Sequence, residues 1–192
     1  MFQMIMKKIK LLLNKMKFPE LILISVLFLS SCNAIWPEES NLNSTTGKVI
    51  AILDGDTYDI LLHGNKTLRI RMEGIDAPER GMPFYRVAKN YLGKLCFEKN
   101  VRLETTGKDN RGRTLAFSYL DDGTELGHEM IKAGLAWHFK KYSADPVLSN
   151  LEIEARNSKL GLWADVHPMP PWDNRRLHHE GTSTKDSFNL KN

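Results

Sequence analysis

Residues 47–72 read GKVIAIL-DGD-TYDILL-HGNK-TLRIRM. Three segments of this stretch, 47–53, 57–62 and 67–72, are rich in Val, Ile and Leu and alternate between apolar and polar positions, which favours β-strands. The segments between them contain Asp-Gly and Gly-Asn, which are typical of tight turns. The stretch therefore predicts a meander of three antiparallel strands.

The rest of the pattern adds two strands and three helices. Strands are predicted over residues 101–104 and 114–120, and helices over 86–97, 124–133 and 145–159. Thr124 and Asp145 are the predicted N-caps of the last two helices, and Pro146 suits a first helical position. Five strands with a helix before the fourth predict an α+β domain, a closed five-stranded OB-fold β-barrel with three packed α-helices.

Composition limits the class of protein. The chain has 192 residues, of which 26% are charged and 9% aromatic, and its formal net charge is +4. These values fit one globular domain with appendages, and they exclude wholesale disorder and a polytopic membrane protein. The first 31 residues contain five lysines and one glutamate, which accounts for all of the net charge. The excess therefore says nothing about a nucleic-acid-binding surface on the domain.

The N-terminus has the features of an export signal. A lysine-rich segment precedes the apolar run 21–28, which is too short for a spanning helix of about 20 residues. Leu-Ser-Ser-Cys follows it and resembles a bacterial lipobox, which implies lipidation of Cys32. The alternatives are a membrane anchor or an ordinary signal sequence with an incidental cysteine, and Met16 is an alternative start. We expect an exported protein, lipid-anchored to the bacterial cell envelope on its periplasmic or cell-surface side.

The domain boundaries follow from these features. Residues 1–31 form the predicted lipoprotein signal peptide, 32–46 a polar tether, 47–176 the folded domain and 177–192 a disordered tail. If Cys32 is acylated, Cys96 is the one remaining cysteine and has no disulfide partner. It lies in an apolar helical pattern, so we expect a buried, inert thiol.

Three short stretches place charge where the strand pattern does not need it. They are Asp54-Gly55-Asp56-Thr57, the segment 71–79, and Lys108-Asp109-Asn110-Arg111-Gly112-Arg113. Each by itself is compatible with an ordinary solvated turn. Together they supply the groups that metal-assisted phosphodiester hydrolysis needs.

Each of these groups suits one task. Asp56 and Asp76 offer carboxylate oxygens to a hard divalent cation. Glu79 is available as a general base for the attacking water. Arg71 and Arg113 offer permanently charged, planar donors to a phosphate that gains negative charge in the transition state.

At this point the sequence resembles the thermonuclease, or staphylococcal nuclease, family. The stretches that carry the resemblance are 54–57, 69–71, 74–80, 109–113, 133–137, 154–156 and 161–164. In order and at family-like spacing, they cover roughly residues 47–175. The resemblance implies an OB barrel with three helices and a Ca2+-dependent nuclease that acts on DNA and RNA and leaves 3′-phosphate ends.

The resemblance also implies roles for individual residues. Asp56, Asp76 and the main-chain carbonyl of Ala77 match the family's calcium ligands. Glu79 matches the glutamate assigned to water activation, a role that is debated for the family. Arg71 and Arg113 match the two arginines that hold the scissile phosphate.

Two further positions are expected to contact substrate. Arg111 stands where the family usually has an aromatic residue, so we expect a change in substrate affinity or preference and retained chemistry. Tyr142 matches an aromatic position near the nucleotide pocket, and a surface tyrosine covering the barrel is an equal alternative. The alternative function is a non-catalytic OB-fold lipoprotein that binds nucleic acid. The expected partners are DNA and RNA, and the membrane through the N-terminal lipid, with the protein a monomer.

Overall fold

The computed structural model describes residues 44–181 and 183. The predicted signal peptide and Cys32 lie outside the described residues, as does most of the predicted tether. Among the described residues, no helix has the length and apolar character needed to cross a membrane.

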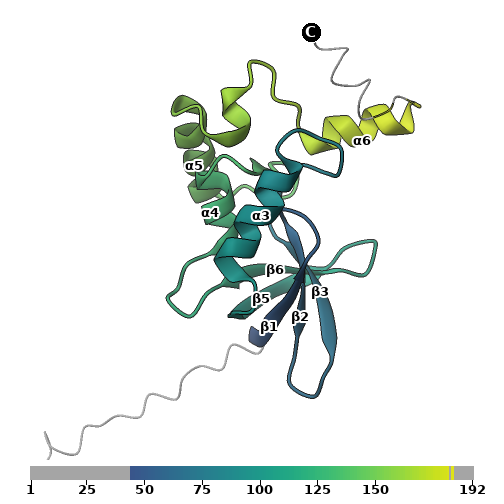
Figure 1. The fold of residues 1–192 in the computed structure, drawn as a ribbon, viewed down its shortest axis with the longest axis vertical. Coiled ribbons are helices and arrows are strands. Elements are labelled where there is room, and N and C mark those ends of the chain that lie inside the picture. Colours follow the sequence, from purple (N-terminus) through teal and green to yellow (C-terminus); the bar gives the residue numbers. More distant parts are fainter. Residues whose placement is uncertain (1–43, 182, 184–192) are drawn as a thin grey trace, which may run out of the picture. The chain divides into compact units, whose positions relative to one another are not determined.

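The five-stranded barrel is confirmed (Figure 1). Its strands are β1 (Ser44–Ile52), β2 (Thr57–Leu61), β3 (Thr67–Met72), β5 (Asn100–Lys108) and β6 (Thr114–Tyr119). They are ordered β1-β2-β3-β6-β5, and β5 closes the barrel by pairing with β1. All neighbours are antiparallel except β3 and β6. The predicted end of the tether at residue 46 is wrong, because Thr45 and Thr46 pair with Leu103 and Arg102 of β5.

A second, two-stranded sheet was not predicted. It joins β4 (Ile75–Asp76) to β7 (Trp137–His138), with Ile75 opposite His138 and Asp76 opposite Trp137. Both strands have only two residues, too few for an alternating pattern to be recognised in the sequence. This small sheet fixes Asp76 just after the third barrel strand.

The described residues contain four α-helices rather than three. They are α3 (Tyr85–Cys96), α4 (Leu126–Lys132), α5 (Pro146–Asn157) and α6 (Pro171–His179), with a 3-10 helix, η1 (Gly161–Ala164), between the last two. Helix α6 overturns the predicted start of a disordered tail at residue 177. Its Pro171 and Asn174 are buried, so packing orders a segment whose composition is mostly polar.

One of the two predicted helix caps is correct. Asp145 caps α5 by accepting a hydrogen bond from the backbone N–H of Val147 at 2.7 Å. Helix α4 is capped by Glu125, which accepts from the backbone N–H of His128 at 2.6 Å, so the prediction of Thr124 is wrong. Thr124 instead lies in the turn before the helix and uses its carbonyl to accept from Leu120.

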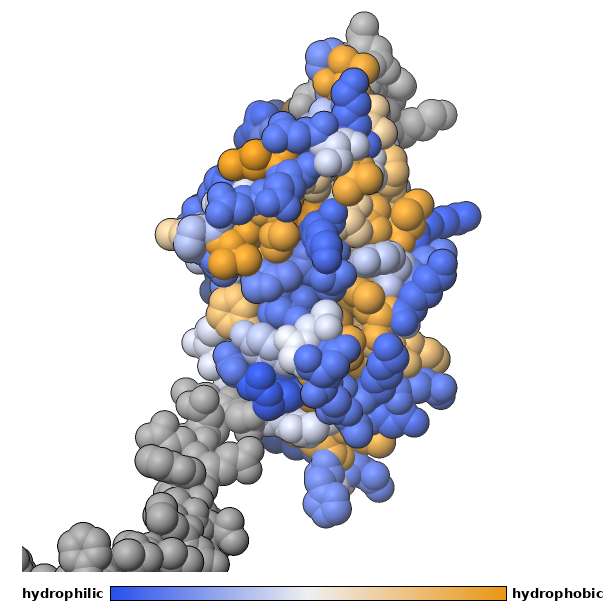
Figure 2. Space-filling model, turned by 90° about the vertical axis from the view of Figure 1, so that its left-hand side faces the viewer, coloured by the Kyte–Doolittle hydropathy of each residue, from blue (hydrophilic) through white to orange (hydrophobic). Residues whose placement is uncertain are grey.

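Two hydrophobic clusters form the core. The larger one fills the barrel and the space beneath α3 and α4, and includes Cys96, which is fully buried as expected. The smaller one contains Trp137 and Trp163. On the face shown in Figure 2, hydrophobic residues form several small groups separated by hydrophilic ones. Such scattered apolar residues are normal on a protein surface.

Candidate active site

A cleft of about 1340 Å³ lies where the turn after β1, the segment from β3 to residue 80, the β5–β6 hairpin, the loop after β7 and helix α6 meet. All the predicted site residues of the described part line it: Asp56, Arg71, Asp76, Ala77, Glu79, Arg111, Arg113 and Tyr142. The structure therefore brings together residues that are far apart in the sequence.

The turn between β1 and β2 holds Asp56. The Asp54 Oδ1 atom accepts a hydrogen bond from the Asp56 backbone N–H at 3.1 Å, which shapes the turn. Asp56 is 5% exposed, and its Oδ2 atom accepts from the backbone N–H of Ala77 at 2.6 Å. A side chain on Gly55 would lie 2.8 Å from the Cβ atoms of Ala77 and Ala88, so glycine is required for this close approach. Ala77 thus contacts Asp56 through its N–H.

Arg71 connects the two predicted aspartate ligands. It is 8% exposed, and its Nη2 atom donates to the Asp76 Oδ1 atom at 2.8 Å. Its Nη1 atom lies 3.1 Å from the Asp56 Oδ2 atom and also donates to the carbonyl oxygens of Met72 and Ile75 at 3.0 and 2.8 Å. The guanidinium therefore neutralises part of the negative charge and also ties β3 to β4.

The aspartates still bring more negative charge into this buried region than the arginines offset. Burial, and then the nearby Asp56 carboxylate, raises the pKa of Asp76 to about 6, although Arg175 and Arg71 oppose this shift. Burial, and then Asp56 again, raises the pKa of Asp54 to about 7. Carboxylates raise one another's pKa in this way when they lie close together and lack sufficient positive charge.

A hard divalent cation would suit this donor set, because its oxygen ligands are carboxylates whose repulsion the cation would relieve. Asp56 and Asp76 are the two carboxylates best placed to hold it. Among residues 44–181, no group of three or more His, Cys, Asp or Glu side chains is already arranged as a complete metal site. Further ligands would have to come from backbone carbonyls or water.

The β5–β6 hairpin positions Arg113. The Asp109 carboxylate accepts from the backbone N–H groups of Arg111 and Arg113, each at 2.9 Å, and from the Arg113 Nε atom at 2.6 Å. Asp109 therefore shapes the turn and orients Arg113. The Arg113 Nη1 atom donates to the Thr57 hydroxyl at 3.3 Å, and that hydroxyl donates to the Asp56 Oδ1 atom at 2.9 Å. Arg111 is exposed on the wall of the cleft.

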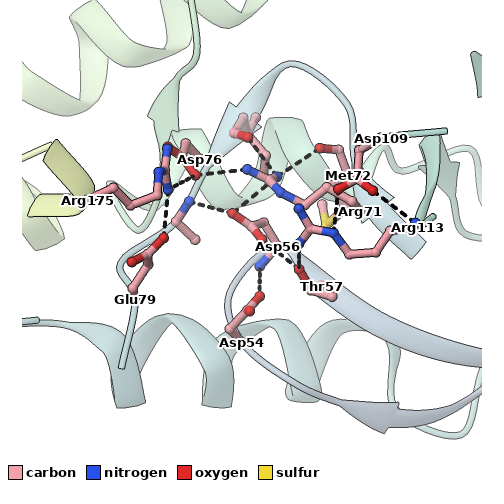
Figure 3. A network of polar contacts seen from close by, with 12 residues as sticks. Asp54, Asp56, Thr57, Arg71, Met72, Asp76, Glu79, Asp109, Arg113 and Arg175 are labelled. Carbon is pink, nitrogen blue, oxygen red and sulfur yellow. Dashed lines mark hydrogen bonds and ion pairs between the residues drawn. The ribbon is translucent and has the colours of Figure 1, made fainter. Parts of the chain in front are cut away.

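Glu79 lies on the loop between β4 and α3, and its partner is a residue that the sequence analysis missed. The Arg175 Nη1 atom donates to the Glu79 Oε1 atom at 2.7 Å, and its Nη2 atom donates to the Asp76 Oδ2 atom at 2.7 Å (Figure 3). Arg175 comes from α6, 96 positions after Glu79. No local motif marked it, since only the packing of α6 brings it to the site.

Tyr142 lies at the edge of the cleft, outside this polar network. Its side chain is 66% exposed, and its ring packs edge-on against Phe139 with 4.9 Å between centroids. The ring lines the cleft and is accessible to a ligand. Its position is compatible with stacking on a base, and its role stays a prediction.

The carboxylates and guanidiniums form one connected network in the cleft (Figure 3). It runs from Arg113 through Thr57 and Asp56 to Arg71. From Arg71 it continues through Asp76 and Arg175 to Glu79. Acidic groups for a cation and a water lie beside planar cations suited to a phosphate. These groups are of the kinds that phosphodiester hydrolysis can use.

A family model described as staphylococcal nuclease homologue matches residues 69–165. The chain belongs to the staphylococcal nuclease family. A Haemophilus influenzae protein named "Uncharacterized endonuclease" is 38% identical over 157 residues, which cover 82% of this chain and 85% of that protein. A "Micrococcal nuclease" of Shigella flexneri is 35% identical over 147 residues, 71% of this chain and 84% of the relative. This member of the staphylococcal nuclease family is accordingly a nuclease, and its substrate is nucleic acid.

Proposed function

We propose that this protein is a Ca2+-dependent nuclease that hydrolyses both DNA and RNA and leaves 3′-phosphate ends. The proposal includes export, anchoring of a monomer to the cell envelope by lipid on Cys32, and a cleft that faces the extracytoplasmic side. The observation that carries the proposal is the connected network of Asp56, Asp76, Arg71 and Arg113 in one cleft. Family membership supports a nuclease of this kind.

Asp56 and Asp76 would hold the Ca2+ ion, with the carbonyl of Ala77 as a further ligand. When bound, the ion would supply positive charge for the phosphate and polarise a water molecule. Burial of the two aspartates, 5% and 2% exposed, keeps their carboxylates in a fixed orientation. The Ala77 N–H and Arg71 contribute to this orientation through their hydrogen bonds.

Glu79 would take the proton of the attacking water. Its side chain is 40% exposed, so it faces the open part of the cleft where water and substrate enter. A general base must lie within hydrogen-bond reach of the water that it activates, and a position on the wall of the cleft satisfies this need. The proton would therefore move to the Glu79 carboxylate.

Arg113 and Arg71 would stabilise the negative charge that develops on the phosphate. A guanidinium has five N–H donors. The hydrogen bonds of Arg113 within the described residues use its Nε and Nη1 atoms. Its Nη2 group is therefore available to a phosphate oxygen, while Asp109 keeps the guanidinium plane fixed. Charge stabilisation that strengthens in the transition state lowers the barrier directly.

A cleavage assay tests the proposal. The protein that begins after Cys32 is incubated with DNA and, separately, with RNA, with chelator alone and with Ca2+ restored. We expect digestion of both substrates only with Ca2+, and 3′-phosphate at the new ends. Glu79→Gln serves as the matched control, with strongly reduced activity expected. Nucleic-acid binding without any cleavage would instead support the non-catalytic OB module.

A second assay addresses the anchor. Cells that express the full chain are labelled with a radioactive fatty acid, and the Cys32→Ser variant is the control. We expect label on the wild-type protein and none on the variant. Label on neither chain would leave the nuclease proposal intact and remove the lipid anchor from it.

A further inference from the structure

Helix α6 places in the cleft a guanidinium that was not predicted, that of Arg175. We propose that α6 is part of the active site, and that Arg175 is a positioning residue that holds the Glu79 carboxylate beside that of Asp76. This inference rests on the proposed function, because it assigns Arg175 a role through the proposed base. It adds a residue, and a whole helix, to the machinery of the reaction.

The contacts of Arg175 join the two acids directly. Its two terminal nitrogens each donate at 2.7 Å, Nη1 to Glu79 and Nη2 to Asp76, and Nη1 also lies 3.4 Å from the Asp76 Oδ1 atom. A planar guanidinium that contacts two carboxylates through different nitrogens fixes the distance and orientation between them. Figure 3 shows Arg175 between the two side chains.

Arg175 is itself held by a packed anchor one helical turn earlier. The Trp172 ring stacks on Phe139, with 5.2 Å between centroids and 3° between planes. Trp172 also meets Trp137 edge-on at 5.6 Å. Trp137 pairs with Asp76 in the small sheet, so the anchor of α6 lies on the strand next to Asp76. Residues three apart on a helix share a face, so this anchor determines where Arg175 points.

Glu79 needs such a partner more than the other acids do. Asp56 lies in the turn before β2 and Asp76 in β4, and both are almost fully buried, whereas Glu79 lies on a loop with 40% of its side chain exposed. The backbone hydrogen bond from the Met82 N–H to the Glu79 carbonyl lies within this loop and does not join it to α6. The Glu79 carboxylate, by contrast, is held by its bond to Arg175.

The competing interpretation is a latch, in which Arg175 occupies the cation position and has to leave before the metal binds. Two observations favour positioning. Trp172 packs against Trp137 of β7 and against Phe139, and Asn174 is buried, so these contacts hold α6 beside β7 with Arg175 in the cleft. The Asp76 Oδ1 atom accepts from Arg71 at 2.8 Å and from Arg175 at 3.4 Å, whereas Oδ2 accepts from Arg175 at 2.7 Å and keeps a second lone pair for a cation.

The test compares Arg175→Ala, Arg175→Lys and Arg176→Ala in the full chain, solubilised in detergent. Arg176 is the matched control, because it is next in sequence and its ion pairs, to Asp173 and Glu180, stay within α6 and its end. We expect Arg175→Ala to lower kcat about 10- to 100-fold with a smaller change in KM, the usual cost of losing a residue that orients a metal-site group. Arg175→Lys should recover part of kcat, and Arg176→Ala should match the wild type.

Two further measurements separate positioning from other causes. Hydrogen exchange at the Met82 amide should accelerate in Arg175→Ala and not in Arg176→Ala, because the loop loses its tie to α6. In a Glu79→Gln background, Arg175→Ala should cost less than about threefold in residual kcat, since residues that act through one contact are not additive. The midpoint of a Tb3+ luminescence titration should stay within about threefold of the wild type.

Several results would overturn the inference. One is an Arg175→Ala enzyme that is faster and binds Tb3+ more tightly, as a latch predicts. Another is an equal fold-loss of kcat from Arg175→Ala in the wild-type and Glu79→Gln backgrounds. A third is unchanged hydrogen exchange at the Met82 amide. The failure of the proposed function would look different. In that case the wild-type chain would show no Ca2+-dependent cleavage, while hydrogen exchange would still report whether Arg175 holds the Glu79 loop.

Discussion

Replacing Arg71 with methionine should destabilise the fold as well as remove the proposed phosphate contact. The Arg71 side chain is 10% exposed, and its aspartate partners Asp56 and Asp76 are 7% and 3% exposed, so solvent screens these pairs little. Arg71→Met keeps an unbranched aliphatic side chain and leaves both carboxylates without this cation. Breaking a buried pair by removing one partner costs about 3–5 kcal/mol. We expect the free energy of unfolding to fall by about that amount.

The measurement is urea unfolding of protein that begins after Cys32, in chelator, followed by fluorescence. Arg69→Met is the matched control on the same strand. Arg69 pairs with Asp59 at 2.8 Å, but its side chain is 52% exposed, so its loss should cost at most about 1 kcal/mol. Equal losses for the two variants would refute the argument that burial of the Arg71 pairs sets the cost.

A second variant checks the cause. Asp76→Asn combined with Arg71→Met removes one of the charges that Arg71→Met leaves without this cation. The double variant should therefore recover part of the stability that Arg71→Met loses. The activity of the double variant should stay at the level of Arg71→Met or below. Full additivity of the two stability losses would mean that the Arg71–Asp76 contact contributes nothing to the fold.

Three further predictions follow from single residues. Arg111→Tyr should raise KM and reduce the slope of log affinity against log salt by about 1, with little change in kcat, in filter-binding and rate measurements at several salt concentrations. His138 is buried between the hydroxyls of Ser143 and Ser149, each at 3.1 Å, and burial lowers its pKa below 6.5. The unfolded chain therefore takes up this proton first as the pH falls, so the stability difference between the wild type and His138→Gln should shrink from about pH 8 to about pH 5, by at most about 1.4 kcal/mol per pH unit. Burial raises the pKa of Cys96 to about 12, so iodoacetamide should label this thiol far more slowly in native protein than in urea.

The barrel could be predicted because its signals are local. The alternation of residues 47–72 and the turns within it determine three neighbouring strands, and these pair as expected. The cap of α5 was also predictable, since Asp145 needs only the next two residues to make its bond. The α4 cap was missed because Glu125 is an uncommon N-cap, and its choice depends on a buried position that accepts from Ser118 as well.

The parts of the site that escaped prediction depend on tertiary packing. The β4–β7 pair has too few residues for a pattern, although it positions Asp76. Helix α6 has a polar composition, and its order comes from Trp172 packing against Trp137 and Phe139. Arg175 was therefore invisible as a site residue. The charged motifs identified which acids belong together, and the fold was needed to identify what holds them.

Arg71 and Arg175 both donate to Asp76, and each has a second role of a different kind. Arg71 donates to Oδ1 from a buried position and bonds two backbone carbonyls, so its removal damages the fold together with the site. Arg175 donates to Oδ2 with 32% of its side chain exposed and reaches Glu79, whose side chain is 40% exposed, so solvent screens that pair and its stability contribution is small. Arg175 also pairs with Asp76, whose side chain is 3% exposed, so we expect Arg175→Ala to lower the stability less than Arg71→Met does, and the same urea unfolding measures this difference.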